Sequence, residues 1–331
     1  MKIHVLMPEG PVRDRFLPED CFRALDGMGE LLWNPSTVQY GADVLRAIVM
    51  DCDVVVTGWG CPLVGGDNLP EGARLSLVAH TGGSVASFVD RTTFARGVKV
   101  CAANEIFAKS VAEGTIAYML ASLRRIPFWA DAVQRRRWNA FVDIGTRGLL
   151  DRTVGLIGFG AVARHLAPML RAFDAAVKVH ADHLTAAECA HYGIEKATLA
   201  EIAACDVISL HNALTPETRG MIGEAFFDSV RDGALFVNTA RGAIVDQRAL
   251  GAALRTGRFS AVLDVFEEEP LPDDSPLRGL PNVILMPHLA GPTDDRQAIC
   301  GRAMVGEIRR FGAGEALLFE IGRDAALRMT R

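Results

Sequence analysis

Three charged or titratable side chains follow three apolar runs in the second half of the chain. Arg241 comes after "ALFVNT", Glu269 after "AVLDVF" and His288 after "NVILMP". A hydride transfer at a carbinol carbon needs a base for the hydroxyl proton, and a carboxylate can hold a histidine in that role. An arginine exposed on such a turn can clamp a substrate carboxylate in a bidentate manner and polarise the adjacent carbonyl. Any one of the three residues alone fits a solvated or structural side chain, but the set predicts a site.

A glycine loop precedes these residues in "TVGLIGFGAVARHLAPMLRAF". Gly158, Gly160 and Ala163 form G-x-G-x-x-A directly after an apolar run and at the start of a helical pattern. The first glycine permits a tight turn, the second lets the backbone approach a pyrophosphate, and the small third residue packs helix on strand. A structural turn without a ligand is the alternative, but the context favours a dinucleotide site.

The next apolar run ends in "VHADH", which places Asp182 where an acidic residue can bind the ribose hydroxyls. No arginine lies within 181–187 to neutralise a 2′-phosphate, so NAD is favoured over NADP. His183 and the nearby Arg164 keep NADP open as the second choice.

Short apolar runs alternate with helical patterns along most of the chain, which predicts doubly wound parallel sheets with helices on both faces. Ser110 and Glu113 fit a capping box that would begin a long helix, and Pro127 would mark its end or a kink. The predicted strands are 3–7, 53–58, 75–80, 153–158, 176–181, 206–211, 233–239, 260–266 and 282–288.

The length of 331 residues suggests two domains, and the net charge of −5 gives no footprint for nucleic acid. The basic run 135–137 fits a solvated or subunit-contacting helix face. Seven scattered cysteines without a CxxC pair indicate reduced thiols in a cytoplasmic protein, and no metal site is expected. We expect no signal peptide and no membrane span, because the start lacks an apolar h-region and no run of about 18 apolar residues occurs.

Five motifs together resemble the D-isomer-specific 2-hydroxyacid dehydrogenase family, which includes phosphoglycerate and glyoxylate/hydroxypyruvate reductases. The resemblance is dense from about residue 100 to 293 and thinner before it. The motifs are "GLIGFGAVARHLA", "LHNALTPETRGMIG", "VNTARGAIVDQRAL", "LDVFEEEPLPDDSPL" and "PNVILMPHLAGPT".

The resemblance implies a role for each residue that matches a family motif. His288 would be the acid/base, Glu269 its partner and Arg241 the ligand of the substrate carboxylate and carbonyl. Gly82, Gly83 and Ser84 would bind the substrate carboxylate through backbone N–H groups. The implied cofactor-binding residues are Gly158, Phe159, Gly160, Ala161, Val162, Asp182, His211, Thr239, Ala240, Arg241, Asp264, His288 and Gly291, with Asp264 holding the nicotinamide carboxamide.

The fold implied by the resemblance is a pair of doubly wound parallel-sheet α/β domains with a cleft between them. A discontinuous, flavodoxin-like substrate domain would comprise 1–104 plus 290–331. An inserted Rossmann NAD domain would comprise 105–289. The helix from Ser110 would serve as a hinge and as the interface of a homodimer.

The sequence departs from the family pattern at several positions. Ala181 occupies the place of the usual ribose-binding aspartate, with Asp182 one position later, and "HNAL" (211–214) replaces His-x-Pro-Leu. "TGGSVASFVD" replaces the common glycine loop of the first domain, so the substrate side is divergent. The loops 58–64 and 80–87 are expected to shape the pocket, where Trp59 fits either an aromatic wall or a packing role. Glu269 argues against a formate dehydrogenase, which usually has glutamine there.

The expected function is hydride transfer between NAD and a small D-2-hydroxy acid or 2-keto acid. One alternative is the oxidation of another small oxyanion such as phosphite, which uses the same three residues. A second alternative is a dinucleotide-sensing interaction protein similar to the co-repressors built on this fold. No disordered tail that could dock a partner is evident in the sequence, which disfavours the second alternative.

Overall fold

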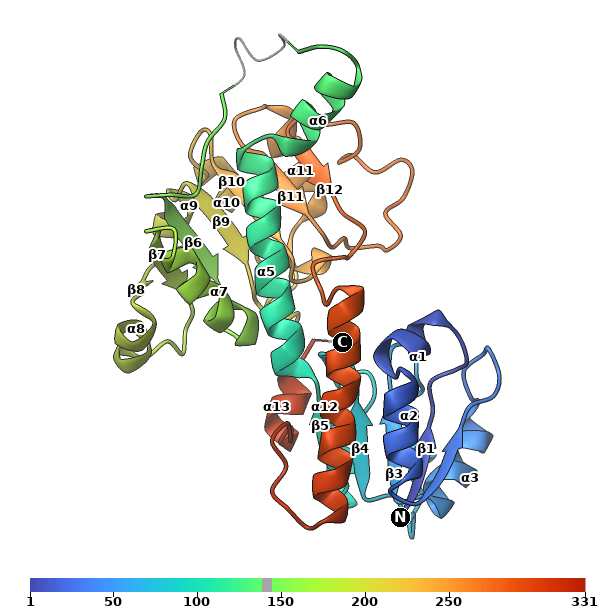
Figure 1. Cartoon of the computed structure of the whole chain (residues 1–331). Coiled ribbons are helices and arrows are strands. Elements are labelled where there is room, and N and C mark those ends of the chain that lie inside the picture. The colour runs from blue at the N-terminus through green and yellow to red at the C-terminus, as the bar shows by residue number, and fades with distance from the viewer. Residues whose placement is uncertain (139–144, 331) are drawn as a thin grey trace. The chain divides into compact units, whose positions relative to one another are not determined.

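The computed structural model describes residues 1–138 and 145–330, whose strands form two parallel sheets (Figure 1). The chain divides into two compact units, Met1–Ala108 with Pro292–Arg331 and Lys109–Gly291. One sheet belongs to each unit, which confirms the predicted fold class of two parallel-sheet α/β domains. The substrate and cofactor roles expected of the two domains stay predictions.

The first unit contains a sheet of five described strands in the order β2-β1-β3-β4-β5, all parallel. This is the strand order of flavodoxin-like folds. Every residue of β3 and β4 is buried, as expected where helices cover both faces of a parallel sheet. The strands are β1 (Lys2–Val5), β2 (Glu30–Trp33), β3 (Val54–Thr57), β4 (Leu77–His80) and β5 (Lys99–Ala102). The helices are α1 (Pro11–Phe16), α2 (Glu19–Asp26), α3 (Ala42–Asp51), the 3-10 turn η1 (Gly66–Asn68), α4 (Arg91–Ala95), α12 (Asp294–Gly312) and α13 (Arg323–Arg328).

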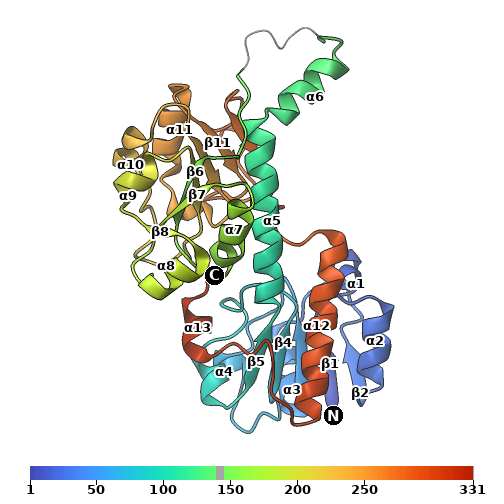
Figure 2. The ribbon, with the colours of Figure 1, turned by 60° about the vertical axis from the view of Figure 1, so that its left-hand side comes forward.

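Helix α12 returns to the N-terminal helices although it is separated from them by more than 250 residues (Figures 1 and 2). A side chain at Gly301 would place its Cβ 1.7 Å from the Phe16 carbonyl oxygen, so the two backbones touch. Arg302 Nε donates to Asp20 Oδ2 at 2.7 Å. The first unit is therefore complete only when both of its chain segments are present.

The second unit contains a sheet of seven described strands in the order β12-β11-β10-β9-β6-β7-β8. The order reverses between β6 and β9, which is where doubly wound sheets bind ligands. The strands are β6 (Thr153–Ile157), β7 (Ala176–His180), β8 (Glu195–Lys196), β9 (Val207–Leu210), β10 (Leu235–Asn238), β11 (Ser260–Leu263) and β12 (Val283–Leu285). The helices are α5 (Asn104–Leu123), which belongs to this unit from Lys109 on, α6 (Ile126–Gln134), α7 (Ala161–Arg171), α8 (Ala186–Tyr192), α9 (Leu199–Ala203), α10 (Glu224–Ser229), the 3-10 turn η2 (Gly242–Ile244) and α11 (Gln247–Arg255).

Both faces of this sheet are apolar, because neighbouring residues of one strand enter different cores. Leu235 and Val237 of β10 pack in a cluster with residues of α5 and α7, whereas Phe236 packs in a cluster with residues of α9, α10 and α11. A run that is apolar at every position therefore marks a buried parallel strand, as the sequence predicts.

The predicted start of the long helix at Ser110 is wrong. Helix α5 begins at Asn104, and Phe107 N already donates to Ala103 O at 3.0 Å, so Ser110 lies inside the helix and is buried. Pro127 falls in the first turn of α6, where a missing N–H removes no helical hydrogen bond.

Strands β2, β5 and β8 are absent from the prediction. Strand β2 lies at a sheet edge and is largely exposed, with an apolar run of only three residues, and β8 has only two residues, both exposed.

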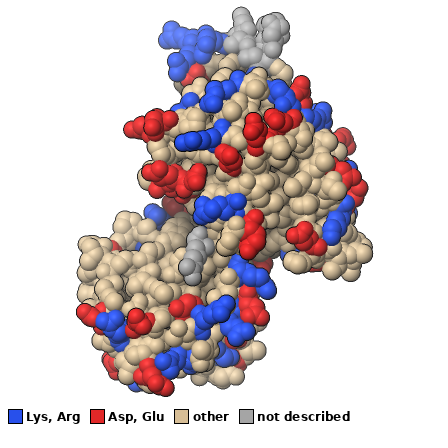
Figure 3. Space-filling view, turned by 180° about the vertical axis from the view of Figure 1, so that it is seen from behind, with Lys and Arg blue, Asp and Glu red and all other residues tan. Residues whose placement is uncertain are grey.

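The distribution of charged side chains on the surface and the burial of the cysteines are typical of a globular protein. Acidic and basic side chains alternate over the face shown in Figure 3. The seven cysteines are free, and all except the half-buried Cys189 are buried. Within the described residues, no helix combines the length and apolar character needed to cross a membrane.

Candidate functional site

The Arg241 turn begins at the end of β10 and is shaped by Asn238. The Asn238 side chain accepts from Ala240 N at 3.0 Å and donates to the Arg241 carbonyl at 3.1 Å. A Cβ on Gly242 would lie 1.9 Å from the carbonyl carbon of Phe266, so only glycine lets this turn approach the chain that follows β11. Asn238 and Gly242 thereby fix where Arg241 leaves the backbone.

Arg241 is half-buried, which corrects the expectation of an exposed loop arginine. Its Nη1 donates to the Ala240 carbonyl at 2.7 Å. Burial lowers the pKa of Arg241, and the charge of Glu269 opposes that effect, but a guanidinium remains a cation at neutral pH. A partly desolvated cation attracts an anionic ligand more strongly than a solvated one does.

Glu269 and His288 form a direct pair. Glu269 Oε1 accepts from Phe266 N at 2.9 Å, and Glu269 Oε2 lies 2.7 Å from His288 Nδ1. Because a carboxylate only accepts, the Nδ1 atom carries a proton and Nε2 is left to exchange one. The side chains of His288 and Glu269 are 50% and 36% exposed, so both are accessible from outside the unit.

The backbone of the histidine loop is fixed by Asp264, which is 1% exposed. The Asp264 carboxylate accepts from Leu289 N at 2.7 Å and from Ala290 N at 2.9 Å, while the Asp264 carbonyl accepts from His288 N at 2.9 Å. His288 itself has a φ of 57°, a left-handed conformation that is uncommon outside glycine. Asp264 therefore holds His288 in a conformation that the loop would not favour alone.

Tyr118 of α5 completes this support, and sequence reasoning did not identify it. Its hydroxyl donates to Asp264 Oδ1 at 3.0 Å. Burial and the charge of Asp264 raise the pKa of Tyr118, so the hydroxyl stays a donor at neutral pH. The contact with the nicotinamide that the resemblance implies for Asp264 stays a prediction.

The glycine turn lies at the point where the strand order reverses. Gly158 follows β6 with a φ of 93°, and a Cβ there would lie 2.7 Å from Asn212 N, just beyond β9. Gly160 is the N-cap residue of α7, has no side-chain cap, and a Cβ there would meet nothing within 4 Å. An uncapped N-terminus of an 11-residue helix beside open space fits the pyrophosphate of a dinucleotide.

The adenosine-side residues are only partly arranged as predicted. Asp182 is exposed two residues beyond β7, and its carbonyl accepts from Lys196 Nζ at 3.2 Å. Arg164 is paired with Glu188 at 2.7 Å, and its guanidinium carbon lies 5.1 Å from the centre of the Phe159 ring. Arg164 is thus already paired with a carboxylate of the protein, and the residues around Asp182 do not distinguish NAD from NADP.

The other predicted cofactor residues belong to the same unit. His211 Nε2 lies 2.9 Å from Ser209 Oγ, and burial lowers the pKa of His211 to about 4, so this imidazole is neutral at pH 7. The Thr239 hydroxyl is 3.0 Å from that of Thr115 in α5. Half-buried positions are occupied by Ala161, Val162, Ala240 and Gly291.

The predicted substrate loop, Gly82–Ser84, belongs to the first unit and follows β4. A Cβ on Gly82 would lie 2.4 Å from His80 Nε2, and one on Gly83 would lie 3.1 Å from the Phe107 side chain. A side chain at Gly82 would collide with the buried His80 ring, and one at Gly83 would fit only if Phe107 moved slightly. Burial lowers the pKa of His80 to about 3, and its Nδ1 is 2.9 Å from Thr57 Oγ1.

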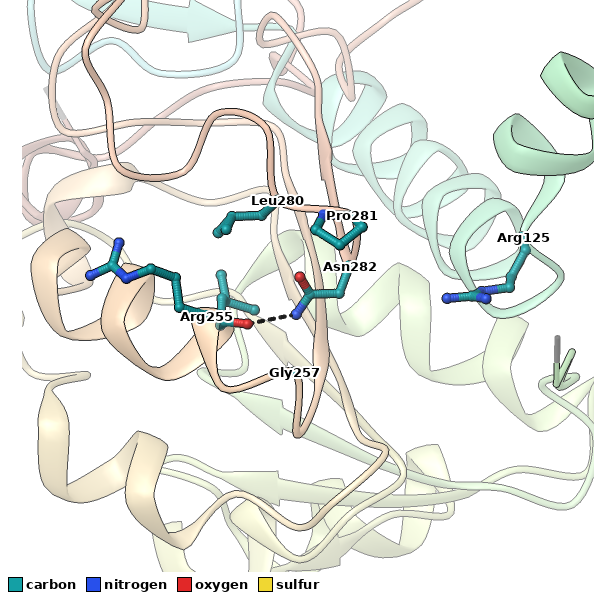
Figure 4. Close-up of a pocket in the computed structure, with 7 residues that line it drawn as sticks. Arg125, Arg255, Gly257, Leu280, Pro281 and Asn282 are labelled. Atoms are coloured by element: carbon teal, nitrogen blue, oxygen red, sulfur yellow. Dashed lines mark hydrogen bonds between the residues drawn. The ribbon is translucent and has the colours of Figure 1, made fainter. Parts of the chain in front are cut away.

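A surface pocket of about 300 Å³ lies in the second unit, apart from these residues (Figure 4). Two of its lining residues are joined by a hydrogen bond, in which Asn282 Nδ2 donates to the Leu254 carbonyl at 2.9 Å. None of the predicted catalytic residues lines it. The lining residues are Arg125, Leu254, Arg255, Gly257, Leu280, Pro281 and Asn282.

Comparison with known proteins places this geometry in a family. Residues 116–290 match the model of the D-isomer specific 2-hydroxyacid dehydrogenase, NAD binding domain. The D-3-phosphoglycerate dehydrogenase of Methanocaldococcus jannaschii is 32% identical over 302 residues, which cover 90% of this chain and 56% of that protein. The chain spans about half the length of the curated relatives it matches.

Solved structures share the fold over the whole chain. A phosphoglycerate oxidoreductase from Rhizobium etli is 25% identical with a TM-score of 0.78, covering 98% of this chain and 99% of its own. A glyoxylate reductase from Paecilomyes thermophila has a TM-score of 0.81 at 23% identity, with 98% and 99% covered. The second likeness supports the fold alone.

Proposed function

The chain belongs to the D-isomer specific 2-hydroxyacid dehydrogenase family, and we propose that it transfers a hydride between NAD and a small D-2-hydroxy acid or its 2-keto acid. The observation that carries the proposal is the 2.7 Å contact between Glu269 and His288. The turn that holds Arg241 packs at Gly242 against Phe266, three residues before Glu269. An imidazole held by Glu269, together with a half-buried cation that senses the charge of the same carboxylate, is suited to moving a proton at a substrate that carries a carboxylate.

The nicotinamide, when bound, supplies or accepts the hydride at the substrate carbon. In the oxidative direction, His288 Nε2 takes the hydroxyl proton as the carbon loses its hydride, and in reduction the imidazolium returns that proton to the carbonyl oxygen. Glu269 stabilises the imidazolium through Nδ1 and keeps the ring oriented. Arg241 binds the substrate carboxylate and polarises the carbonyl.

The cofactor would be held by the turn around Gly158 and Gly160. The first-turn N–H groups of α7 would face the pyrophosphate, and the open space at Gly160 would admit it. His211, which is neutral, and the Thr239 hydroxyl belong to the same unit and would add no charge to the cofactor site.

A homodimer is part of the proposal, and exposed apolar side chains on one helix support it. Ile126, Phe128 and Val133 of α6 are 51%, 39% and 49% exposed, which is unusual for large apolar residues on one short helix. Light scattering of the purified protein tests this, with a mass of twice the chain expected and a monomer mass counting against it.

The first test of the activity follows the absorbance of NADH, and separately of NADPH, with glyoxylate, hydroxypyruvate, pyruvate and phenylpyruvate. We expect turnover with at least one acid, and its loss in His288→Ala while NADH still binds. Turnover only with NAD and phosphite would favour oxidation of another oxyanion. NADH binding without turnover on any of these compounds would favour a dinucleotide-sensing role.

A further inference from the structure

The Gly82–Ser84 loop is tied to the segment 315–330 by the hydroxyl of Ser84. Ser84 Oγ donates to the Thr330 carbonyl at 2.6 Å and accepts from Ala86 N at 3.4 Å. The hydroxyl is thus engaged both as donor and as acceptor within the protein. Ser84 holds its loop in place instead of presenting a hydroxyl to a ligand.

The segment 315–330 is anchored near its start by Glu307 of α12. Glu307 is 1% exposed, and its Oε2 accepts from Leu318 N at 2.7 Å and from Phe319 N at 2.9 Å. Arg310 lies 3.6 Å from the other carboxylate oxygen. Hydrogen bonds to a buried, charged acceptor are among the stronger ones in proteins, so this end of the segment is firmly held.

The middle of the segment runs along the edge strand of the sheet. Ala102 N donates to the Phe319 carbonyl at 3.2 Å, and Ile321 N donates to the Val100 carbonyl at 2.8 Å. The segment therefore covers the outer edge of β5 before α13 begins, and Figure 2 shows α13 next to α4. Ala326 of α13 is 1% exposed, so this helix is packed and not loosely attached.

The loop is held from both directions by these contacts. His80 and Phe107 touch Gly82 and Gly83 from the interior of the unit, and Thr330 holds Ser84 from the segment 315–330. A loop that binds an anion through backbone N–H groups must keep those groups in one orientation. Ordering the loop before the ligand arrives removes part of the entropy cost of binding.

We propose that Ser84 is a positioning residue and that the segment 315–330 is a strap that fixes the Gly82–Ser84 loop, so that the strap sets the KM for the 2-keto acid. The proposal rests on the proposed function and on the role that the family resemblance implies for this loop, which is to bind the substrate carboxylate through backbone N–H groups. The strap and the loop belong to the first unit, whereas His288 and the turn around Gly158 belong to the second. Its loss should therefore change KM more than kcat.

The kinetic test compares Ser84→Ala with Ser84→Thr, which keeps a hydroxyl. Ser229→Ala is the matched control, because Ser229 Oγ also donates to a backbone carbonyl, that of Phe226 at 2.7 Å in the other unit. Loss of one such bond should raise the KM of the best 2-keto acid about fivefold to tenfold. We expect kcat and the NADH dissociation constant, measured by fluorescence, to change less than twofold. Ser229→Ala should resemble the wild type, and Ser84→Thr, which keeps the hydroxyl, should have a KM nearer the wild-type value than that of Ser84→Ala.

A second readout needs no turnover. Trp59 lies 6.1 Å from Phe107, centre to centre, and Phe107 contacts Gly83, so Trp59 emission reports on the loop when oxalate is added. Trp59→Phe identifies the share of emission that belongs to this residue. Trypsin cleavage after Arg328, followed by mass spectrometry, reports release of the strap. We expect Ser84→Ala to weaken oxalate binding and to accelerate this cleavage.

The outcomes separate the strap from the proposed function. Weakened oxalate binding and faster cleavage in Ser84→Ala, without turnover on any 2-keto acid, would support the strap and reject the activity. Turnover with a KM that is unchanged in Ser84→Ala would reject the strap and leave the activity intact. Oxalate binding that is absent, or equal in the wild type and Ser84→Ala, would also overturn the strap.

Discussion

Glu269 Oε2 lies 2.7 Å from His288 Nδ1, although the two residues are 19 positions apart and leave different strands of the sheet. The second oxygen of Glu269 is occupied by the backbone N–H of Phe266, so the carboxylate cannot turn away from the ring. The pair therefore sets which imidazole nitrogen carries the proton. It also fixes the direction in which the other nitrogen points.

Replacing Glu269 tests that arrangement. In Glu269→Gln, one amide group must face two donors, Phe266 N and His288 Nδ1, so one of the two contacts is lost. Without the carboxylate the imidazolium is less stable, and reduction needs the imidazolium. We expect the reductive kcat to fall about 100-fold at pH 7. Steady-state kinetics with NADH and the best 2-keto acid measure this change.

Glu268→Gln is the control for this experiment, because Glu268 is exposed and adjacent. A Glu269→Gln enzyme with the kcat of Glu268→Gln would show that the carboxylate is not needed.

Replacing Arg241 tests the substrate anchor. Lysine keeps the charge in Arg241→Lys but loses the planar pair of donors, so a carboxylate can no longer be bound in a bidentate manner. We expect the KM for the 2-keto acid to rise roughly 10-fold to 100-fold, and NADH affinity to change less than this KM. Arg255→Lys, at the separate pocket of Figure 4, should leave KM unaffected. Equal KM values for the two variants would exclude Arg241 as the anchor.

The open space at Gly160 gives a test of the cofactor turn. A methyl group in Gly160→Ala meets no protein atom within 4 Å, so folding should be unaffected, but it would occupy the space proposed for the pyrophosphate. We expect the NADH dissociation constant to rise at least tenfold, by fluorescence titration. Gly41→Ala is matched, because Gly41 is also an uncapped N-cap residue with open space and an extended backbone. NADH affinity that is the same in both variants would place the pyrophosphate elsewhere.

Buried His80 makes the stability of the first unit depend on pH. Burial lowers the pKa of His80 from 6.5 to about 3 in the folded protein, so between these values the unfolded chain binds a proton that the folded chain does not. The free energy of unfolding must therefore decrease as the pH falls through this range. For His80 alone, the loss between pH 7 and pH 5 is roughly 2 kcal/mol.

Urea unfolding of His80→Gln at pH 7 and pH 5 measures this contribution. The variant should lose less stability over that range than the wild type, whatever its stability at pH 7. Burial also lowers the pKa of His4 and His211 to about 4, so part of the pH dependence should remain. His183→Gln, which changes an exposed histidine, should keep the wild-type dependence. An identical dependence in His80→Gln would contradict the prediction.

The apolar runs predict most of the strands because these strands are buried on both faces. Val54–Thr57 and Val207–Leu210 have no exposed position, and each appears in the sequence as a continuous apolar run. The largely exposed edge strand Glu30–Trp33 has a weaker signature, since contacts with one neighbour and with solvent require no fixed pattern. The local capping signal at Ser110 failed because a helix had already begun upstream, at a position set by the preceding strand.

In the candidate site, too, some residues can be predicted from the sequence and others cannot. Arg241, Glu269 and His288 are visible in the sequence because each follows an apolar run, and the carboxyl ends of parallel strands share one edge. The support of His288 is not visible. Tyr118 and Asp264, which form a hydrogen bond, are separated by 146 positions in the sequence, and Asp264 and Leu289 by 25. No local sequence pattern indicates either contact. Such contacts depend on packing between distant segments, which one sequence does not encode locally.

The return of α12 to Phe16 and Asp20 has a consequence for the order of events during synthesis. The ribosome synthesises residues 1–108 first. Helix α12, which packs against α1 and α2, is synthesised only after residue 293. All of Lys109–Gly291 is made in between and can fold as a unit while the first unit still waits for its last helix. During that interval, apolar surface that α12 later buries is open to solvent and to chaperones.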